Sequence, residues 1–189
     1  MSASLESATE GFLPGAEKLP DFRGETSWRL EKGKIPEQMA ALKAKGFTYL
    51  VDLTAVDHHG EDPRFEVVYE LCDIQRKKHL RIKTKVSEGD SVPTVSHIWK
   101  TAEWHEREAW DMVGIRFAGH TDLRRILMWD GYPHHPLRKD FPLAGLSTEM
   151  PDIAFTAKAP LEGGPFVTNS ASLTQDREPR AHPAEERNL

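Results

Sequence analysis

The stretch RFEVVYELCDIQRKKHLRIKTKV, residues 64–86, decides the fold class. Its second half, HLRIKTKV, alternates apolar side chains with Arg and Lys, which is the period of two of a half-buried β-strand. RFEVVYELCD alternates in the same way, so a second strand is expected there. The two segments predict a hairpin through DIQRKK, in which Glu66 and Glu70 face the Arg/Lys row across the ladder.

The segments around this hairpin predict further elements of the same domain. TYLVDLTAVD, residues 48–57, is a nearly continuous apolar run, which is typical of a central strand covered on both faces. IPEQMAALKAKG, residues 35–46, predicts a helix that ends at its glycine. Apolar positions from Trp99 to Val113 recur three and four residues apart, so they form one face of a second helix. The predicted fold class is α+β: a single domain with a small mixed or antiparallel sheet and helices on one face.

Composition divides the chain into three parts. Residues 1–24 are rich in Ser, Glu, Gly and Pro without apolar periodicity and are expected to form a flexible N-terminal arm. Residues 25–143 hold the α+β domain. Residues 144–189 are polar and rich in proline and have too few large apolar residues for a core of their own, so they are expected to form a C-terminal tail.

The totals exclude several functional classes. The net charge of −5 across 189 residues argues against a general nucleic-acid binder, whose surface should be basic. Cys72 is the only cysteine, so the chain can form no internal disulfide, and an iron–sulfur cluster typically needs about four cysteines. No stretch approaches the roughly 20 apolar residues of a membrane span, and the chain is expected to be intracellular and soluble by itself.

The segment EWHEREAWD, residues 103–111, concentrates charge on the second predicted helix. A zinc-protease helix needs histidines four residues apart, but His105 is followed at that spacing by Ala109, so the zinc interpretation fails. Carboxylates three residues apart could act as an acid/base pair, although solvated helix charges have this spacing more often. Arg107 and Asp111 are placed to form a local ion pair.

Glu106 differs from the other charges, because the periodicity places it on the apolar face of the helix. A carboxylate there must find a donor or cost several kcal/mol. Arg124, Arg125 and Arg138 are the candidate donors. We therefore expect Glu106 and one of these arginines to form a buried or interfacial brace.

The histidines outside this helix leave a metal site open as an alternative. His58-His59, His120 and His134-His135 are the candidates, and His120 could join His134 or His135. Adjacent histidines rarely bind one metal, so loop histidines bonded to backbone are the favoured interpretation. The sequence has no glycine-rich nucleotide loop and no nucleophile elbow, which favours a scaffold or partner-binding protein.

A longer pattern begins at Glu106. Glu106-Arg107-Glu108, Asp111-Met112-Val113, His120, Arg124 and Ile126-Leu127 together resemble the signature of the respiratory complex I 30 kDa subunit family. GFTYLVDLTAVD, RFEVVYEL and GHTDLRRIL followed by HPLRKDFPL extend the resemblance over roughly residues 35–143. Thr121 stands where the family usually has proline.

The resemblance implies the role of the C subunit of NADH–quinone oxidoreductase. This is a cofactor-free, structural component of the hydrophilic arm, and FMN and the iron–sulfur clusters belong to partner subunits. The implied partners are the D subunit, the closest, and the B, I and G subunits, with no nucleic acid. The resemblance also implies that the C-terminal tail, residues 144–189, is extended and packs on a partner subunit. The implied location is peripheral, on the cytoplasmic side of the bacterial inner membrane, with membrane contact only through the complex. No catalytic, cofactor-binding or metal-binding residue is expected in this chain.

The resemblance and the basic loop HHPLRKDFPL together supply the candidate interface residues, since arginine and aromatic residues are enriched in interfaces. They are Glu106, Arg107, Glu108, Asp111, His120, Arg124, Arg125, His135, Arg138, Lys139 and Asp140. Two alternatives remain open. One is the equivalent subunit of a membrane-bound hydrogenase or ferredoxin-fed dehydrogenase, and the other is a stand-alone metal-dependent hydrolase that uses the His/Glu cluster.

Overall fold

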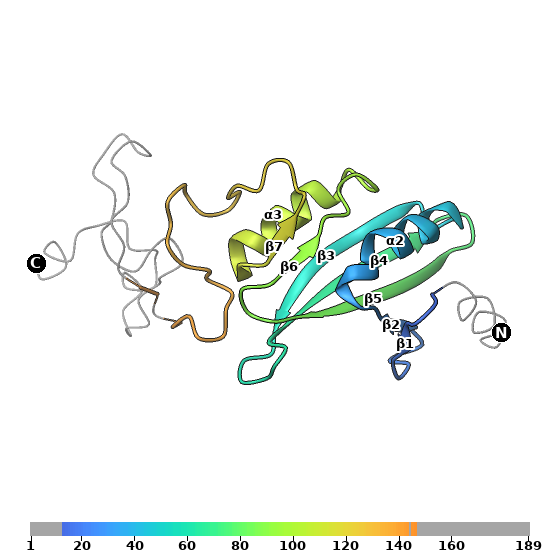
Figure 1. The fold of residues 1–189 in the computed structure, drawn as a ribbon, viewed down its shortest axis with the longest axis horizontal. Helices are drawn as coiled ribbons and strands as arrows, with labels where there is room; N and C mark the ends of the chain where they lie inside the picture. Colours follow the sequence, from blue (N-terminus) through green and yellow to red (C-terminus); the bar gives the residue numbers. More distant parts are fainter. Residues whose placement is uncertain (1–12, 144, 147–189) are drawn as a thin grey trace, which may run out of the picture. The chain divides into compact units, whose positions relative to one another are not determined.

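The computed structural model describes residues 13–143 and 145–146, and it has the predicted α+β class (Figure 1). The elements are β1 (Glu17–Lys18), β2 (Ser27–Arg29), the 3-10 helix η1 (Lys32–Lys34), α2 (Ile35–Ala44), β3 (Tyr49–Asp57), β4 (Phe65–Asp73), β5 (Lys78–Val86), β6 (Ser91–Pro93), α3 (Ala102–Val113) and β7 (Arg116–Ala118). All of them lie in a first compact unit that ends at Met128, and a second unit begins at Trp129. The expected boundary of the α+β domain at residue 143 stays a prediction.

The predicted hairpin forms the centre of a five-stranded sheet in the order β1-β2-β5-β4-β3. β4 pairs antiparallel with both β3 and β5, whereas β2 joins β5 in parallel. Glu70 lies opposite Arg81, and their side chains are 2.8 Å apart. Glu66 contacts Lys83 at 3.0 Å. The predicted pairing of acids on one strand with bases on the next is thus confirmed.

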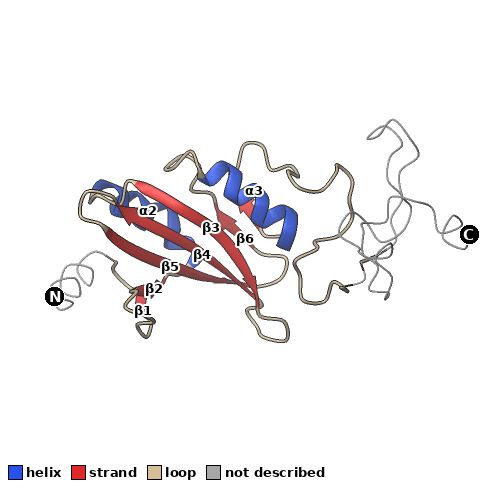
Figure 2. Cartoon of the chain, turned by 180° about the vertical axis from the view of Figure 1, so that it is seen from behind, coloured by secondary structure: helices blue, strands red, loops and turns tan. Residues whose placement is uncertain are grey.

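The two helices lie on one face of this sheet, as predicted (Figures 1 and 2). The inward residues of β4 and β5 are fully buried, as Val67, Tyr69 and Ile82 show, and so are Ile35 and Met39 of α2. Burial of these side chains, each contributing about 1.5–3 kcal/mol, holds the helical layer on the sheet.

Strand β3 corrects one expectation, because it is an edge strand and not a central one. Its outward side chains are exposed, Tyr49 by 45% and Val56 by 38%. The segment before and within α3 covers its open edge, where the Trp99 indole Nε1–H donates to the carbonyl of Thr48 at 3.1 Å. A continuous apolar run occurs in a central strand with both faces covered. It also occurs in an edge strand with one covered face and a covered edge, so the sequence alone does not separate the two.

The N-terminal boundary also differs from the expectation. The flexible arm was expected to include residues 13–24, but Leu13 is buried and β1 pairs antiparallel with β2. A short strand with few apolar residues gives no periodic signal, so the sequence did not reveal it. The expectations for residues 1–12 and for the tail beyond residue 146 fall on residues outside the described part of the chain.

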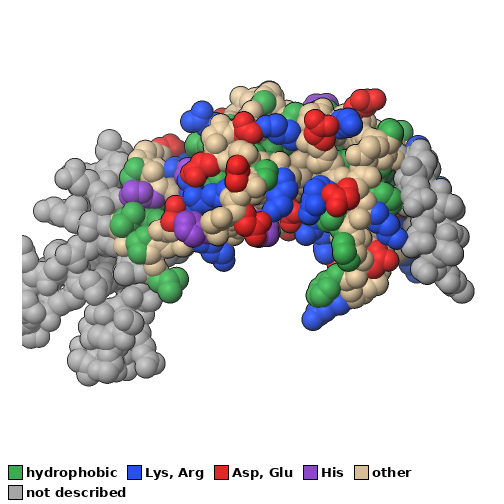
Figure 3. All heavy atoms as spheres, turned by 60° about the horizontal axis from the view of Figure 1, so that its bottom comes forward, with side chains coloured by type: hydrophobic (Ala, Val, Ile, Leu, Met, Phe, Trp, Pro, Cys, Tyr) green, Lys and Arg blue, Asp and Glu red, His purple; other side chains and the backbone are tan. Residues whose placement is uncertain are grey.

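The sheet face opposite the helices carries charged side chains of both signs. Figure 3 shows acidic and basic side chains interleaved over one side of the molecule. On this face Glu70 pairs with Arg81 at 2.8 Å and Glu66 with Lys83 at 3.0 Å. Cys72 lies on β4 directly across from His79, with 3.8 Å between its Sγ and the imidazole Nε2. This face is therefore largely neutralised by pairing within the sheet.

Candidate interaction site around helix α3

Helix α3 carries the start of the signature and ends where the sequence predicts. Gly114 follows its last residue with φ of 89°, a left-handed conformation that glycine adopts without strain. Ala102, Glu106, Ala109 and Val113 are buried, so the predicted apolar face is confirmed.

Glu106 is fully buried, but its partners are not the expected arginines. Its carboxylate accepts hydrogen bonds from the Thr94 hydroxyl at 2.5 Å and from the Val95 backbone N–H at 2.7 Å. The prediction of an arginine brace is wrong for Arg124 and Arg125, which contact other groups. Arg138 belongs to the second unit and is not placed relative to Glu106. Backbone donors carry no residue-type signal, so sequence reasoning could not rank Val95 above an arginine.

Burial weakens the Glu106 carboxyl as an acid. The loss of solvation raises the pKa of its carboxyl, although the bonds from Thr94 and Val95 and the nearby His120 oppose that rise. The His120 Nε2 lies 3.9 Å from the carboxylate. Glu106 therefore joins α3 to the segment after β6. Its ionised form is destabilised there by the loss of solvation.

His120 uses both ring nitrogens inside the fold. Its Nδ1 accepts from the Asp122 N–H and its Nε2 donates to the Glu103 carbonyl, each at 3.1 Å. The side chain is fully buried. A histidine engaged in this way has no lone pair left to bind a metal, which weighs against the metal site that the sequence left open.

Asp111 joins α3 to a second segment, residues 126–128, as Glu106 joins it to the segment after β6. Its Oδ2 accepts three consecutive backbone N–H groups, from Ile126 at 3.0 Å, Leu127 at 2.7 Å and Met128 at 2.9 Å. Its Oδ1 accepts from Arg125 at 2.5 Å. Burial disfavours the charged form, but these four donors outweigh it and hold the pKa of Asp111 below its ordinary value.

Arg107 fixes the same segment from the neighbouring turn of the helix. Its Nε donates to the Arg124 carbonyl at 3.1 Å, and its Nη2 donates to the Arg125 carbonyl at 3.2 Å. Its guanidinium also lies 5.0 Å from the centre of the Trp104 ring. We refer to Arg107, Asp111 and Arg125 as the α3 clamp, because together they bind residues 124–128 to the helix.

The remaining candidate residues take part neither in the Glu106 contacts nor in the α3 clamp. Glu108 is exposed, and Arg124 is an exposed side chain that pairs with Asp122 at 2.9 Å. The other candidates belong to the second unit: His135, Arg138, Lys139 and Asp140. In that unit the rings of Trp129, Tyr132, His134 and Phe141 follow one another with centroids 4.5, 5.6 and 5.9 Å apart.

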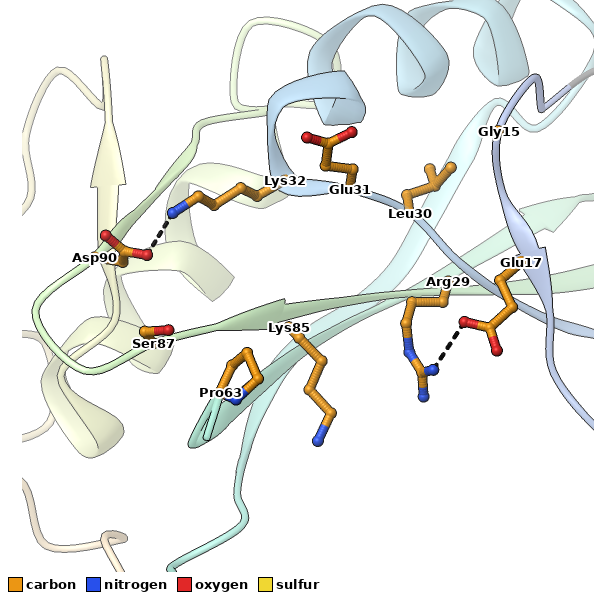
Figure 4. A pocket seen from close by; sticks show the side chains of 10 residues that line it. All are labelled: Gly15, Glu17, Arg29, Leu30, Glu31, Lys32, Pro63, Lys85, Ser87 and Asp90. Atoms are coloured by element: carbon orange, nitrogen blue, oxygen red, sulfur yellow. Dashed lines mark hydrogen bonds and ion pairs between the residues drawn. The ribbon is translucent and has the colours of Figure 1, made fainter. Parts of the chain in front are cut away.

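A cavity of about 390 Å³ opens elsewhere in the first unit, beside the end of β2 (Figure 4). Its charged lining is paired: Arg29 binds Glu17 at 2.9 Å, and Lys32 binds Asp90. Ser87 is 3.3 Å from Asp62, and no histidine or cysteine lies among the lining residues. The lining thus brings together no nucleophile and base of the kind that acyl or phosphoryl transfer requires.

The described residues offer neither a metal site nor a membrane-spanning helix. Residues 13–143 and 145–146 contain no group of three or more His, Cys, Asp and Glu side chains arranged to hold a metal ion. Within the same residues, no helix has the length and apolarity to cross a bilayer.

The comparisons with known proteins agree with one another. Residues 28–147 match the family model described as the 30 kDa subunit of the respiratory-chain NADH dehydrogenase. The second C subunit of NADH-quinone oxidoreductase of Rhizobium meliloti is 55% identical over 104 residues, which are 55% of this chain and 57% of that protein. The C subunit of the Geotalea uraniireducens enzyme is 46% identical, over 74% of this chain and 87% of that protein. The chain thus spans little more than half of the first relative and most of the second.

Two solved structures and one fused relative extend this result. The trypsin-resistant fragment of Nqo5 is 32% identical with a TM-score of 0.58, over 63% of this chain and 98% of that fragment. A chain of the archaeal membrane-bound sulfane sulfur reductase is 26% identical with a TM-score of 0.66, over 74% of this chain and 86% of that one. The C/D subunit of NADH-quinone oxidoreductase of a Sulfurihydrogenibium species is 42% identical, over 79% of this chain but only 27% of that protein.

The curated relatives are named as subunits of NADH-quinone oxidoreductase, one solved structure is an archaeal respiratory membrane complex, and the family model covers well over half of the chain. The chain belongs to the 30 kDa subunit family of the respiratory-chain NADH dehydrogenase.

Proposed function

We propose that the chain is a structural, cofactor-free C subunit in the hydrophilic arm of a proton-translocating NADH–quinone oxidoreductase. The observation that carries the proposal is the use of the signature side chains inside the fold. Four signature side chains hydrogen-bond to backbone groups of nearby segments: Glu106, Arg107, Asp111 and His120. These bonds fix the backbone around α3. Groups engaged in this way serve to hold a surface in shape, not to move a substrate proton.

Membership of the family supports a set of proposed partners. The D subunit is the expected neighbour, because in one relative the C and D subunits are named as one protein, of which this chain matches about a quarter. The B, I and G subunits would complete the surroundings, with FMN and the iron–sulfur clusters in partner chains. The complex would place this chain peripherally on the cytoplasmic side of the bacterial inner membrane. By holding the D subunit and its neighbours in register, the chain would support electron transfer from NADH to quinone.

Affinity purification tests the proposal. A tagged chain expressed in its own host should recover the D and B subunits from detergent-solubilised membranes, together with NADH–quinone oxidoreductase activity. Recovery of the tagged chain alone, under conditions that keep the complex assembled, would contradict it.

A second candidate is the equivalent subunit of a related complex with another electron donor. The likeness to a chain of the archaeal sulfane sulfur reductase supports it, because the same fold occurs in a complex that is not named for NADH. The same purification distinguishes the two candidates. Activity with hydrogen or reduced ferredoxin, and none with NADH, would favour the second. Metal analysis of the purified chain tests the remote hydrolase alternative, which predicts stoichiometric zinc or iron.

A further inference from the structure

Two large exposed apolar side chains lie next to the α3 clamp: Trp104 on the helix itself and Leu127 in the segment that the clamp binds to the helix. Trp104 is 61% exposed and Leu127 is 57% exposed. Exposed single leucines are common on soluble proteins, but a tryptophan with most of its surface in water is not, because it is among the largest apolar side chains. The contacts beneath these two residues show what distinguishes them.

Trp104 is held from below. The guanidinium of Arg107 lies 5.0 Å from the ring centre. Arg107 is itself only 5% exposed, and two backbone carbonyls fix its position. The indole thus rests on a fixed cation, while most of its surface remains open to solvent. A ring held in one orientation loses little conformational entropy when a partner covers it.

Leu127 is held by the other half of the clamp. Its backbone N–H donates to Asp111 at 2.7 Å, and the N–H groups on both sides bind the same oxygen. Arg124, three residues earlier, exposes 67% of its side chain and pairs only with Asp122, which is 49% exposed, among the described contacts. Such exposed pairs are weak, so the guanidinium can exchange its carboxylate for one on a partner.

We propose that Trp104 and Leu127, with Arg124 at the rim, anchor the docking of the D subunit on this chain. The proposal rests on the function proposed above and names the surface that performs it. Tryptophan and arginine are the side chains most enriched among residues that dominate interface energies. The surface calls for an apolar pocket on the partner that receives the indole, with a carboxylate beside it for Arg124. The D subunit is the occupant because a relative joins the two subunits in one named protein.

The opposite face of the sheet also exposes Tyr49 and Val56, but each is less exposed than Trp104 and Leu127. Its acidic and basic side chains pair with each other, as Glu70 with Arg81 and Glu66 with Lys83. An aromatic side chain of similar exposure, Phe22 at 63%, lies in the turn between β1 and β2 and stacks with its chain neighbour Arg23, which is itself exposed. Phe22 therefore serves as a matched control: equally exposed and aromatic, but outside the clamp.

The experiment compares Trp104→Ala, Leu127→Ser and Phe22→Ala in the tagged full-length chain. The first two should lower the amount of the D subunit recovered from solubilised membranes by about tenfold or more, whereas Phe22→Ala should recover as much as wild type. The melting temperatures of the purified variants should stay close to that of wild type, because the substituted side chains are exposed. Wild-type recovery of the D subunit by both Trp104→Ala and Leu127→Ser would overturn the inference.

Photo-crosslinking tests the same surface while Trp104 and Leu127 stay intact. A photo-crosslinking residue in place of Glu108, which is exposed one helical turn from Trp104, should crosslink to the D subunit. Crosslinks to other subunits without any to this one would overturn the assignment. If wild type itself recovers no D subunit, the proposed function fails first. If wild type recovers it but the anchor variants do so equally well, only the inference fails.

Discussion

At the residue level, Glu106 and Asp111 lie five positions apart on one helix, both fully buried, yet their pKa values move in opposite directions. Glu106 receives two hydrogen bonds, from Thr94 and Val95, and burial outweighs them. Asp111 receives three backbone N–H groups and an arginine, and these outweigh burial. Asp111 has two more donors than Glu106, one of them the Arg125 guanidinium, and these additional donors favour its ionised form.

Removal of the Glu106 carboxylate should destabilise the fold. Glu106→Ala leaves the Val95 N–H and the Thr94 hydroxyl buried without their acceptor and opens a cavity, so the free energy of unfolding should fall by about 2–4 kcal/mol. Glu106→Gln keeps an acceptor and the volume, so its loss should be smaller. Urea unfolding measures both. Glu108→Ala, exposed on the same helix, is the control and should change stability by less than about 0.5 kcal/mol.

The opposite shifts predict opposite pH dependences. The folded pKa of Asp111 is lowered, so its stabilisation is fully present above the unfolded value of about 4 and is lost as pH falls through the folded pKa. The stability difference between wild type and Asp111→Asn should therefore shrink in acid. The folded pKa of Glu106 is raised, so wild type should lose stability relative to Glu106→Gln as pH rises above about 4.3. Unfolding curves from about pH 3 to pH 7 would contradict this if both differences had the same slope.

At the element level, the sequence predicts where the long strands and helices lie along the chain. It does not predict which elements pack or pair with one another. The alternation in 64–86 and the helical spacing from Trp99 to Val113 are local signals, so they place β4, β5 and α3 close to their observed bounds. The edge position of β3 and the parallel pairing of β2 depend on which segments meet in space. The same limit applies to the candidate site. The spacing predicts that Glu106 is buried, but not its partners, because Thr94 and Val95 come from a segment without a periodic signal.

The end of α3 offers a test of one element boundary. Gly114 has φ of 89°, where a Cβ is strained, so Gly114→Ala should lower stability by about 1–2 kcal/mol and displace the segment that leads into β7. Thermal unfolding followed by circular dichroism measures the loss. Gly33→Ala in η1 is the matched control, because Gly33 has no positive φ and an added Cβ there meets nothing within 4 Å. Equal melting temperatures for the two variants would refute the prediction.

At the level of the whole molecule, the α+β unit and the residues after it are expected to serve different purposes. We expect residues 144–189 to pack on a partner, a prediction that falls almost entirely on residues beyond the described part of the chain. A chain ending at Leu146 should keep the circular dichroism and melting temperature of the full chain, yet recover less of the D subunit from solubilised membranes. Equal recovery by the shortened and full chains would place the whole interface within residues 1–146.

The position of Cys72 has a practical consequence for spectroscopy. It is the only thiol in the sequence, and it lies partly exposed on strand β4, on the sheet face opposite the helices. A nitroxide attached there would sit on a rigid strand, at one defined site, without any engineered cysteine. Its dipolar coupling to paramagnetic centres in neighbouring subunits would give distances from this chain to the electron path, and so locate the chain inside a working assembly.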